Sequence, residues 1–354
     1  DCRVHEPSVA LSLSTNHQAV LFLKSPGCNH TDAWEWVYAM QPAYMTAICV
    51  LGIAGNAFVL AVLCLQRQHS TVADVYLGNL AVADLVMMCC LPFWISTVLH
   101  RFNWAYGTAM CQLVGLVVGM NYLCSVLFLT VVSLDRYVAL ARPLAHRRRR
   151  RSTVARGVCA GVWVLGGMLS LPGLLFRSVD FFPEFGVEAC HLAYPHPGWR
   201  IRYNVTANLV GFLIPVPIVA FSSYHIVAIL TDKQVRSSAT GHAERKAASL
   251  VLVVLAVFVL CWLPYQLVIF LDTLHYYQVI SGCLLEHSLD IWTQLATYLG
   301  YSNSAINPFL YVIVGKHFRH RASAILHTVM SCDKKQAIFV DNSTRYKSTE
   351  RSSV

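Results

Sequence analysis

Residues 246–273 read KAASLVLVVLAVFVLCWLPYQLVIFLDT and carry charge only at Lys246 and Asp272. A helix needs about 20 mostly apolar residues to cross a bilayer, so this stretch is long enough to span one. Six further runs of similar character cover residues 39–65, 73–99, 108–140, 154–176, 201–230 and 289–314. The sequence therefore predicts an all-α membrane protein with a seven-transmembrane helix bundle at 39–314.

The composition agrees with a chain that lies largely in lipid. The 354 residues are 56% hydrophobic and 13% charged, whereas a soluble domain carries about 25% charged residues. The net charge of +9 is concentrated between the apolar runs, above all at Arg142 and Arg147–Arg151. Charge localised in this way, beside seven bilayer-length runs, argues against a nucleic-acid-binding protein.

The basic residues also predict the orientation of the bundle. The first, third and fifth breaks between the runs are basic, as is the C-terminal tail, whereas residues 272–290 contain three acids and no Lys or Arg. Because cytosolic loops carry an excess of Lys and Arg, we expect an extracellular tail at 1–38 and a cytoplasmic C-terminus. A glycosylation sequon at Asn29 agrees with this orientation.

Asp84 lies in the middle of the second apolar run. An ionisable side chain inside a bilayer helix is costly, which makes it a candidate functional group. One interpretation is a sodium site built from hard oxygen ligands, and the alternative is a neutral hydrogen-bond network. The predicted ligands of the sodium site are Asp84, Asn121, Ser125 and Asn303.

Asp135-Arg136-Tyr137 closes the third apolar run, and Glu244 precedes the sixth. An Arg–carboxylate pair between two helix ends can hold a closed state, with bidentate geometry favouring Arg over Lys. Separating the helices would break the pair, so the arrangement is a natural switch. A solvated surface pair, worth about 0–1 kcal/mol, is the alternative interpretation.

Enzyme chemistry is not indicated. The sequence shows no nucleophile–base pair and no Cys/His metal spacing, so we expect no catalytic residue, no cofactor and no metal beyond sodium. A transporter is the rival function, but the inverted repeat and paired broken helices of that class are missing. Cys28, Cys111, Cys190 and Cys283 lie in segments expected outside the cell, where disulfides persist.

Several motifs occur in order along the chain. They are Asn56, LAVAD at 80–84, Asp135-Arg136-Tyr137, Trp163, Pro215, CWLP at 261–264 and NPFLY at 307–311. Together they resemble the class A, or rhodopsin-like, G-protein-coupled receptors. The resemblance implies a plasma-membrane receptor with a heterotrimeric G protein as partner and a Cys111–Cys190 disulfide. One departure is Tyr224, which lies nine residues after Pro215 instead of the usual eight, so we assign it no switch role.

The resemblance also implies that Arg136 and Tyr311 help to form the G-protein site. We group Asp135, Tyr137, Glu244, Asn307 and Pro308 with them as activation and coupling residues.

The C-terminal segment carries three further expectations. One-sided apolar residues at 315–330 predict a short amphipathic eighth helix lying on the membrane lipid, and Cys332 after it is a candidate for palmitoylation. The tail at 331–354 is crowded with Ser and Thr, where phosphorylation would create an acidic strip. We expect receptor kinases and arrestin to act there, and the alternative interpretation is a disordered tail.

A narrower resemblance follows from four stretches. These are TVADVYLGNL at 71–80, LPFW at 91–94, FLDTLH at 270–275 and YVIVGK at 311–316, which look like the bradykinin (kinin) receptors. This implies a second disulfide, Cys28–Cys283, a short cationic kinin-type peptide as agonist, and Gq, phospholipase C and calcium signalling. Another peptide receptor, of the angiotensin or chemokine type, is the runner-up.

The peptide-binding residues combine charge with the resemblance. Asp272 and Asp290 end two helices at the mouth of the expected cavity, where carboxylates attract cationic ligands. Arg177 resembles the family position that meets the C-terminal carboxylate of the peptide. An apolar pocket is expected from five more residues, for which core packing is the alternative: Trp94, Trp262, Tyr265, Gln294 and Tyr301.

The resemblance can be carried further, to one of the two kinin-receptor subtypes. Gly119 stands where the des-arginine subtype has a Lys, and FLDTLH also favours the subtype that reads the intact kinin. The Arg147–Arg151 cluster looks more like the des-arginine subtype, and Arg200 stands where the intact-kinin subtype has a Glu. We therefore predict the intact-kinin subtype, with Arg200 as an extra cation that weakens the acidic pocket.

Overall fold

The computed structural model describes residues 31–65, 71–141, 152–183, 186–231, 239–280, 282–314, 318–319 and 321–324. Side chains not described within these ranges include those of residues 31–37, residues 239–251, Cys283 and Asp290. The long helices are α1 (Thr31–Leu65), α2 (Val72–Leu99), α3 (Gly107–Ala141), α5 (Ser152–Leu175), α9 (Ala239–Tyr276) and α10 (Cys283–Val314). The fifth crossing is divided into α6 (Pro197–Asn208), the π-helix η1 (Leu209–Leu213) and α7 (Pro215–Thr231).

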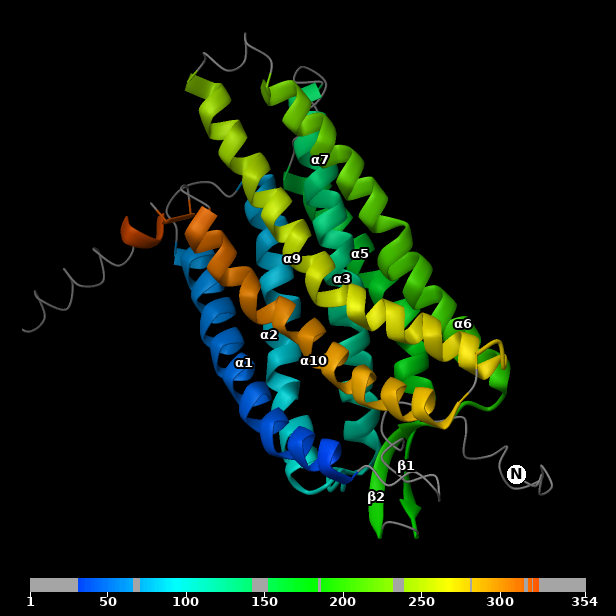
Figure 1. The fold of residues 1–354 in the computed structure, drawn as a ribbon. Helices are drawn as coiled ribbons and strands as arrows, with labels where there is room; N and C mark the ends of the chain where they lie inside the picture. Colours follow the sequence, from blue (N-terminus) through cyan, green and yellow to red (C-terminus); the bar gives the residue numbers. More distant parts are fainter. Residues whose placement is uncertain are drawn as a thin grey trace, which may run out of the picture.

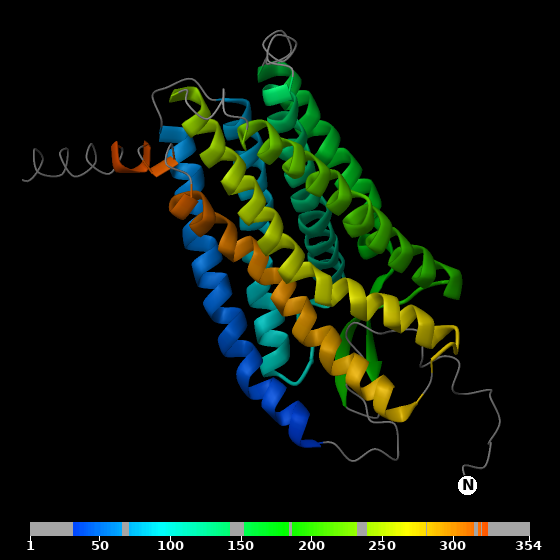
Figure 2. The same ribbon diagram turned by 45° about the horizontal axis from the view of Figure 1, so that its top comes forward.

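The helices pack side by side in one bundle (Figures 1 and 2). α3 lies at its centre and contacts α2, α5, α7 and α9, while α1 packs between α2 and α10. A hairpin of two strands, β1 (Arg177–Phe182) and β2 (Val187–Leu192), lies at one end, which we call the hairpin end. α3 finishes at Ala141 at the opposite end, near the last turn of α7.

Six helical segments of the described chain are long and apolar enough to cross a membrane. They are Tyr38–Leu65, Val72–Leu99, Gly107–Ala141, Thr153–Leu175, Gly198–Ile229 and Leu252–Tyr276. α10 packs against α1 and α9 as the seventh long element of the bundle. The predicted all-α membrane bundle is therefore confirmed, and the chain is a multi-pass membrane protein.

Pro215 explains why the fifth crossing is not one regular helix. Proline has no N–H to donate, so the α-helical ladder is interrupted in the turn before it. There the N–H of Ile214 donates to the carbonyl of Leu209 at 2.9 Å, which is the spacing of a π-helix. Gly211 in this turn lies so close to the ring of Tyr122 that a side chain would overlap it.

The stretch between the apolar runs 154–176 and 201–230 contains the hairpin, which the sequence did not predict. Its strands are antiparallel, and the register pairs Arg177 with Leu192 and Phe182 with Val187. An isolated hairpin is only marginally stable in water, so its position requires a tether. A disulfide between Cys111 of α3 and Cys190 of β2 provides one.

α1 and α10 approach closely through two of the sequence motifs. A Cβ at Gly55 would lie 2.9 Å from the Cβ of Pro308, so only a glycine fits this contact without a shift. The amide of Asn56 donates to the carbonyl of Ser304 at 2.9 Å. Pro264 and Pro308 both lie inside helices, α9 and α10, as the motifs predict.

Part of the predicted eighth helix falls within the described chain. Residues 318–319 and 321–324 are helical. The ring of Phe318 packs edge-on against Phe58 at 6.2 Å, and Arg321 donates to Asp74 at 2.8 Å. These contacts tie the segment to the ends of α1 and α2. The rest of 315–330, Cys332 and the tail at 331–354 lie outside the described residues.

Candidate functional site at the hairpin end

A cavity opens toward the hairpin end between α2, α3, α6, α9 and α10. Its lining includes six of the eight residues predicted to bind a peptide: Trp94, Arg177, Trp262, Tyr265, Gln294 and Tyr301. It also includes residues that the sequence analysis did not assign to binding, among them Phe102, Tyr122, Leu192, Tyr203, Thr293 and Tyr298. Aromatic side chains are thus the largest group in the described lining, which contains a single guanidinium.

That guanidinium belongs to Arg177, the first residue of β1, which is only 9% exposed. Its Nη1 contacts the Sγ of Cys190 at 3.5 Å, and its charged carbon lies 5.7 Å from the centre of the Trp94 ring. Its Nε has no hydrogen-bond partner among the described residues. Burial lowers the pKa of Arg177 from its usual value, but an arginine in a protein stays charged at neutral pH.

Two glycines make room for Arg177 between α3 and α5. A Cβ at Gly115 would overlap the side chain of Arg177 and lie 2.8 Å from the carbonyl oxygen of Gly173. A Cβ at Gly173 would lie 3.0 Å from the carbonyl oxygen of Gly115. The close approach of the two helices therefore depends on both glycines and holds the arginine against the cavity wall.

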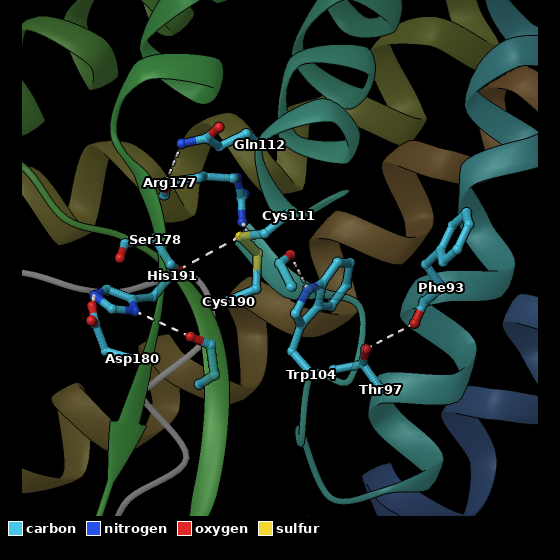
Figure 3. Close-up of a disulfide and its surroundings, with 12 residues drawn as sticks. Phe93, Thr97, Trp104, Cys111, Gln112, Arg177, Ser178, Asp180, Cys190 and His191 are labelled. Atoms are coloured by element: carbon cyan, nitrogen blue, oxygen red, sulfur yellow. Dashed lines mark hydrogen bonds and ion pairs between the residues drawn. A yellow bond between two sulfur atoms is a disulfide. The ribbon is translucent and has the colours of Figure 1, made fainter. Parts of the chain in front are cut away.

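Figure 3 shows how the hairpin is fixed above this wall. Gln112 of α3 donates to the carbonyl of Arg177 at 3.1 Å, beside the Cys111–Cys190 disulfide. The indole of Trp104, which is fully buried, donates to the carbonyl of Gly107 at 2.9 Å. Arg177 is thus positioned by the backbone and by the disulfide that the resemblance implies, and not by a flexible loop.

The floor of the cavity is a polar junction between four helical segments. The hydroxyl of Tyr122 donates to the carbonyl of Ala207 at 3.3 Å and accepts from the amide of Gln266 at 2.7 Å. The Tyr122 ring lies 4.4 Å from that of Trp262. A Cβ at Gly300 would lie 2.8 Å from the Trp262 ring, so α10 closes the junction from the other side.

Neither Tyr122 nor Gln266 was predicted from the sequence to be a site residue. An amide inside a bilayer-length run is itself unusual, and that signal could have drawn attention to Gln266.

The wall formed by α10 is also hydrogen-bonded: Tyr298 donates to Gln294 at 2.8 Å, and Gln41 of α1 donates to Tyr298. The predicted residue Gln294 is therefore held by a relay that reaches α1.

Of the two carboxylates predicted at the mouth of the cavity, the structure describes the side chain of only one. Asp272 is not part of the cavity lining, and its oxygens accept from Arg200 at 2.6 and 2.7 Å. The side chain of Asp290 lies outside the described residues, so its role stays a prediction. The structure thus pairs Asp272 with the very cation that the sequence marks as unusual.

Asp84 is fully buried between α2, α3 and α10. It accepts from Asn121 at 2.9 Å, from Ser125 at 3.4 Å and from Asn307 at 2.9 Å. Asn303, four residues before Asn307, is also buried, but its Oδ1 has no hydrogen-bond partner among the described residues. Three of the four predicted sodium ligands therefore meet, joined by Asn307. They meet through hydrogen bonds donated to Asp84, which is the arrangement of the alternative interpretation, and a bound sodium ion stays a prediction.

At the opposite end, Asp135, Arg136 and Tyr137 occupy the last turns of α3. Tyr137 packs against two rings of α7, Phe221 at 6.1 Å and His225 at 5.8 Å. The side chain of Glu244 is not described, so its pairing with Arg136 stays a prediction.

Tyr311, a predicted coupling residue, and Tyr224, which is not one, have contrasting positions. Tyr311 is 2% exposed, and its hydroxyl has no hydrogen-bond partner among the described residues. Tyr224 is 71% exposed. Cys28 and Asn29 lie outside the described chain, as does the side chain of Cys283.

Comparison with known proteins now places this architecture. The family model described as 7 transmembrane receptor (rhodopsin family) matches residues 55–311. The chain is 40% identical over 314 residues to the B2 bradykinin receptor of Mus musculus, covering 88% of this chain and 80% of that protein. It is 37% identical over 313 residues to the B1 bradykinin receptor of Homo sapiens, covering 87% and 89%.

The B2 bradykinin receptor of Oryctolagus cuniculus gives 41% identity over 304 residues, covering 85% of this chain and 83% of that protein. The two subtypes are similar to this chain to nearly the same degree, so identity does not separate them. These relatives are receptors and not enzymes. The chain belongs to the rhodopsin family of seven-transmembrane receptors and is close to the bradykinin receptors.

Proposed function

We propose that this chain is a receptor for a short cationic kinin-type peptide, which binds in the cavity at the hairpin end. The observation that carries the proposal is the buried guanidinium of Arg177, the one charged side chain in the described lining of the cavity. A buried charge is costly unless it is paired. No salt bridge joins Arg177 to a carboxylate of the described residues, so the C-terminal carboxylate of a peptide would supply the partner.

The rest of the lining suits the remainder of such a peptide. Trp94, Trp262, Tyr265 and Tyr301 offer large apolar surfaces that can bury aromatic or aliphatic residues of the ligand. The Nε1 of Trp94 has no hydrogen-bond partner among the described residues and adds a second donor beside Arg177. Gly119 also lines the cavity, and its lack of a cationic side chain favours the intact kinin over the des-arginine form.

In this proposal the hairpin end faces the outside of the cell and the opposite end faces the cytosol. The agonist must bind the active state more tightly than the inactive one, since a ligand shifts a conformational equilibrium only by its differential affinity. The Tyr122–Trp262 contact at the cavity floor is well placed to pass this difference to α9. Movement of α9 would free Arg136 from Glu244 and open a site for a Gq-type G protein, with calcium release as the result.

The covalent modifications belong to the same proposal. Asn29 would carry a glycan on the outer tail, Cys28 and Cys283 would form a second disulfide, and Cys332 would carry a palmitoyl group. Phosphorylation in 331–354 would recruit arrestin. These features follow from the receptor orientation and from the sequence, and they lie outside the described residues or side chains.

Calcium mobilisation in cells that express this chain tests the proposal. We expect the intact kinin to act at far lower concentration than its des-arginine form. A response that favours the des-arginine form would keep the ligand class and reverse the subtype. Silence toward both peptides, with the receptor shown at the cell surface, would reject the kinin ligand.

A further inference from the structure

An ion pair that lies outside the described cavity lining joins α6 to α9. Nη2 of Arg200 donates to both oxygens of Asp272, at 2.6 and 2.7 Å. The two side chains are only 5% and 14% exposed. The charged carbon of Arg200 also lies 5.3 Å from the centre of the Tyr276 ring, so the guanidinium is held on two sides.

A third residue supports the pair from the α6 side. The amide of Asn204 donates to Thr273 at 3.2 Å and reaches Asp272 at 3.5 Å. Both oxygens of the carboxylate are therefore in contact with donors from α6. A cationic ligand can donate hydrogen bonds to both oxygens of Asp272 only by displacing Arg200.

Such an exchange gains little. The ligand would form one ion pair and break another of the same kind, and the displaced Arg200 would have to leave a buried position or lose both of its hydrogen bonds to Asp272. Breaking a buried pair is strongly unfavourable because it leaves an uncompensated charge. The pair also has no net charge, so it contributes little to the long-range attraction of a cationic peptide.

We infer that Arg200 is a specificity-determining residue: it occupies Asp272 in place of the cationic N-terminal residue of the ligand, so this receptor tolerates a neutral residue there. The inference rests on the proposed function and deepens it, because it concerns one end of the same peptide. On this inference the receptor recognises the C-terminal carboxylate of the peptide through Arg177, whereas the charge at the N-terminus of the peptide contributes little.

Two peptides that differ in one charge test this directly. One is a kinin with N-terminal arginine, and the other has citrulline there, which is nearly the same shape and neutral. Their affinities are measured by competition binding on the full-length receptor in membranes. For the wild type we expect the arginine peptide to bind within about threefold of the citrulline peptide. In Arg200→Gln the loss of both hydrogen bonds from Arg200 to Asp272 should raise this preference to about tenfold or more, equivalent to about 1.4 kcal/mol.

Two variants serve as matched controls. Arg202→Gln removes a positive charge from the same helix, where Arg202 is exposed and stacks on Trp199 at 5.1 Å, without freeing Asp272. It should leave the preference unchanged. The double variant Arg200→Gln with Asp272→Asn has no unpaired charge and should bind both peptides with the wild-type preference.

Three results would overturn the inference. They are a wild-type preference above about thirtyfold, an unchanged preference in Arg200→Gln, and a loss of more than about tenfold for the arginine peptide in the double variant. The last result remains decisive if Arg200→Gln alone fails to fold, because it would show that Asp272 already binds the ligand. Absence of binding by both peptides to every variant at the cell surface would instead reject the kinin proposal itself.

Discussion

Arg177 and Arg200 are two buried arginines at the same end of the bundle, and their surroundings differ in one respect. Each lies over an aromatic ring, Arg177 at 5.7 Å from Trp94 and Arg200 at 5.3 Å from Tyr276. Arg200 has a carboxylate within 2.6 Å, whereas no salt bridge joins Arg177 to a described carboxylate. The difference teaches that burial of a cation does not by itself mark a ligand site, because what matters is whether the chain has already neutralised it.

The largest effect is expected from Arg177→Gln. Removing one partner of a buried charge pair across an interface costs about 2–5 kcal/mol, so the affinity for a kinin should fall by about 100-fold or more. Competition binding measures the loss. A C-terminally amidated peptide provides the control, since amidation should weaken binding to the wild type but add little in Arg177→Gln. Full, independent losses from both changes would show that the carboxylate binds elsewhere.

The second effect concerns the space that Arg177 occupies. In Gly115→Ala the new Cβ would overlap the Arg177 side chain and lie 2.8 Å from the carbonyl oxygen of Gly173. Overpacking of this kind costs about 1–3 kcal/mol, so we expect kinin affinity to fall by about tenfold in the same binding measurement. Gly157→Ala is the matched control, because a Cβ there meets nothing within 4 Å. Equal behaviour of the two variants would contradict the proposed role of Gly115.

Trp94→Leu tests the aromatic ring beside Arg177, the arginine that forms no salt bridge with a described carboxylate. A cation–π contact is worth about 0.5–2 kcal/mol, more when it is desolvated. We expect about a fivefold loss of kinin affinity, because the ring both steadies Arg177 and lines the cavity. Saturation binding with a labelled peptide measures the change. Wild-type affinity in this variant would show that the ring does not contribute to the site.

The helices of this site could be predicted from the sequence, but their ends could not. The run 73–99 corresponds to α2 at Val72–Leu99, and 108–140 corresponds to α3 at Gly107–Ala141, because lipid demands an apolar length that can be read directly. α9 begins at Ala239, well before the run at 246, since a helix can continue into polar surroundings after the apolar residues end. The hairpin was missed because its position depends on a tether to α3 and not on periodicity.

The candidate site was predictable to a similar degree. Six residues of the cavity were expected to bind the peptide, and Arg200 was recognised as an extra cation because the intact-kinin subtype has a Glu at that position. Its partner could not be read, because Arg200 and Asp272 lie 72 residues apart and meet only where α6 packs against α9. The same holds for the contact of Tyr122 with Gln266, which joins residues separated by 144 positions.

The smallest effect is expected from Tyr276→Leu, the counterpart of Trp94→Leu at the neutralised arginine. The substitution removes the ring beside Arg200 but leaves both hydrogen bonds from Arg200 to Asp272. Because Asp272 remains occupied, we expect kinin affinity to change by no more than about twofold, and the preference for N-terminal arginine over citrulline should stay near the wild-type value. A gain of that preference, measured with the same two peptides, would mean that the ring and not the carboxylate keeps Arg200 in place. Arg200 would then be a residue that the ligand can displace, and the contrast with Arg177 would be one of degree.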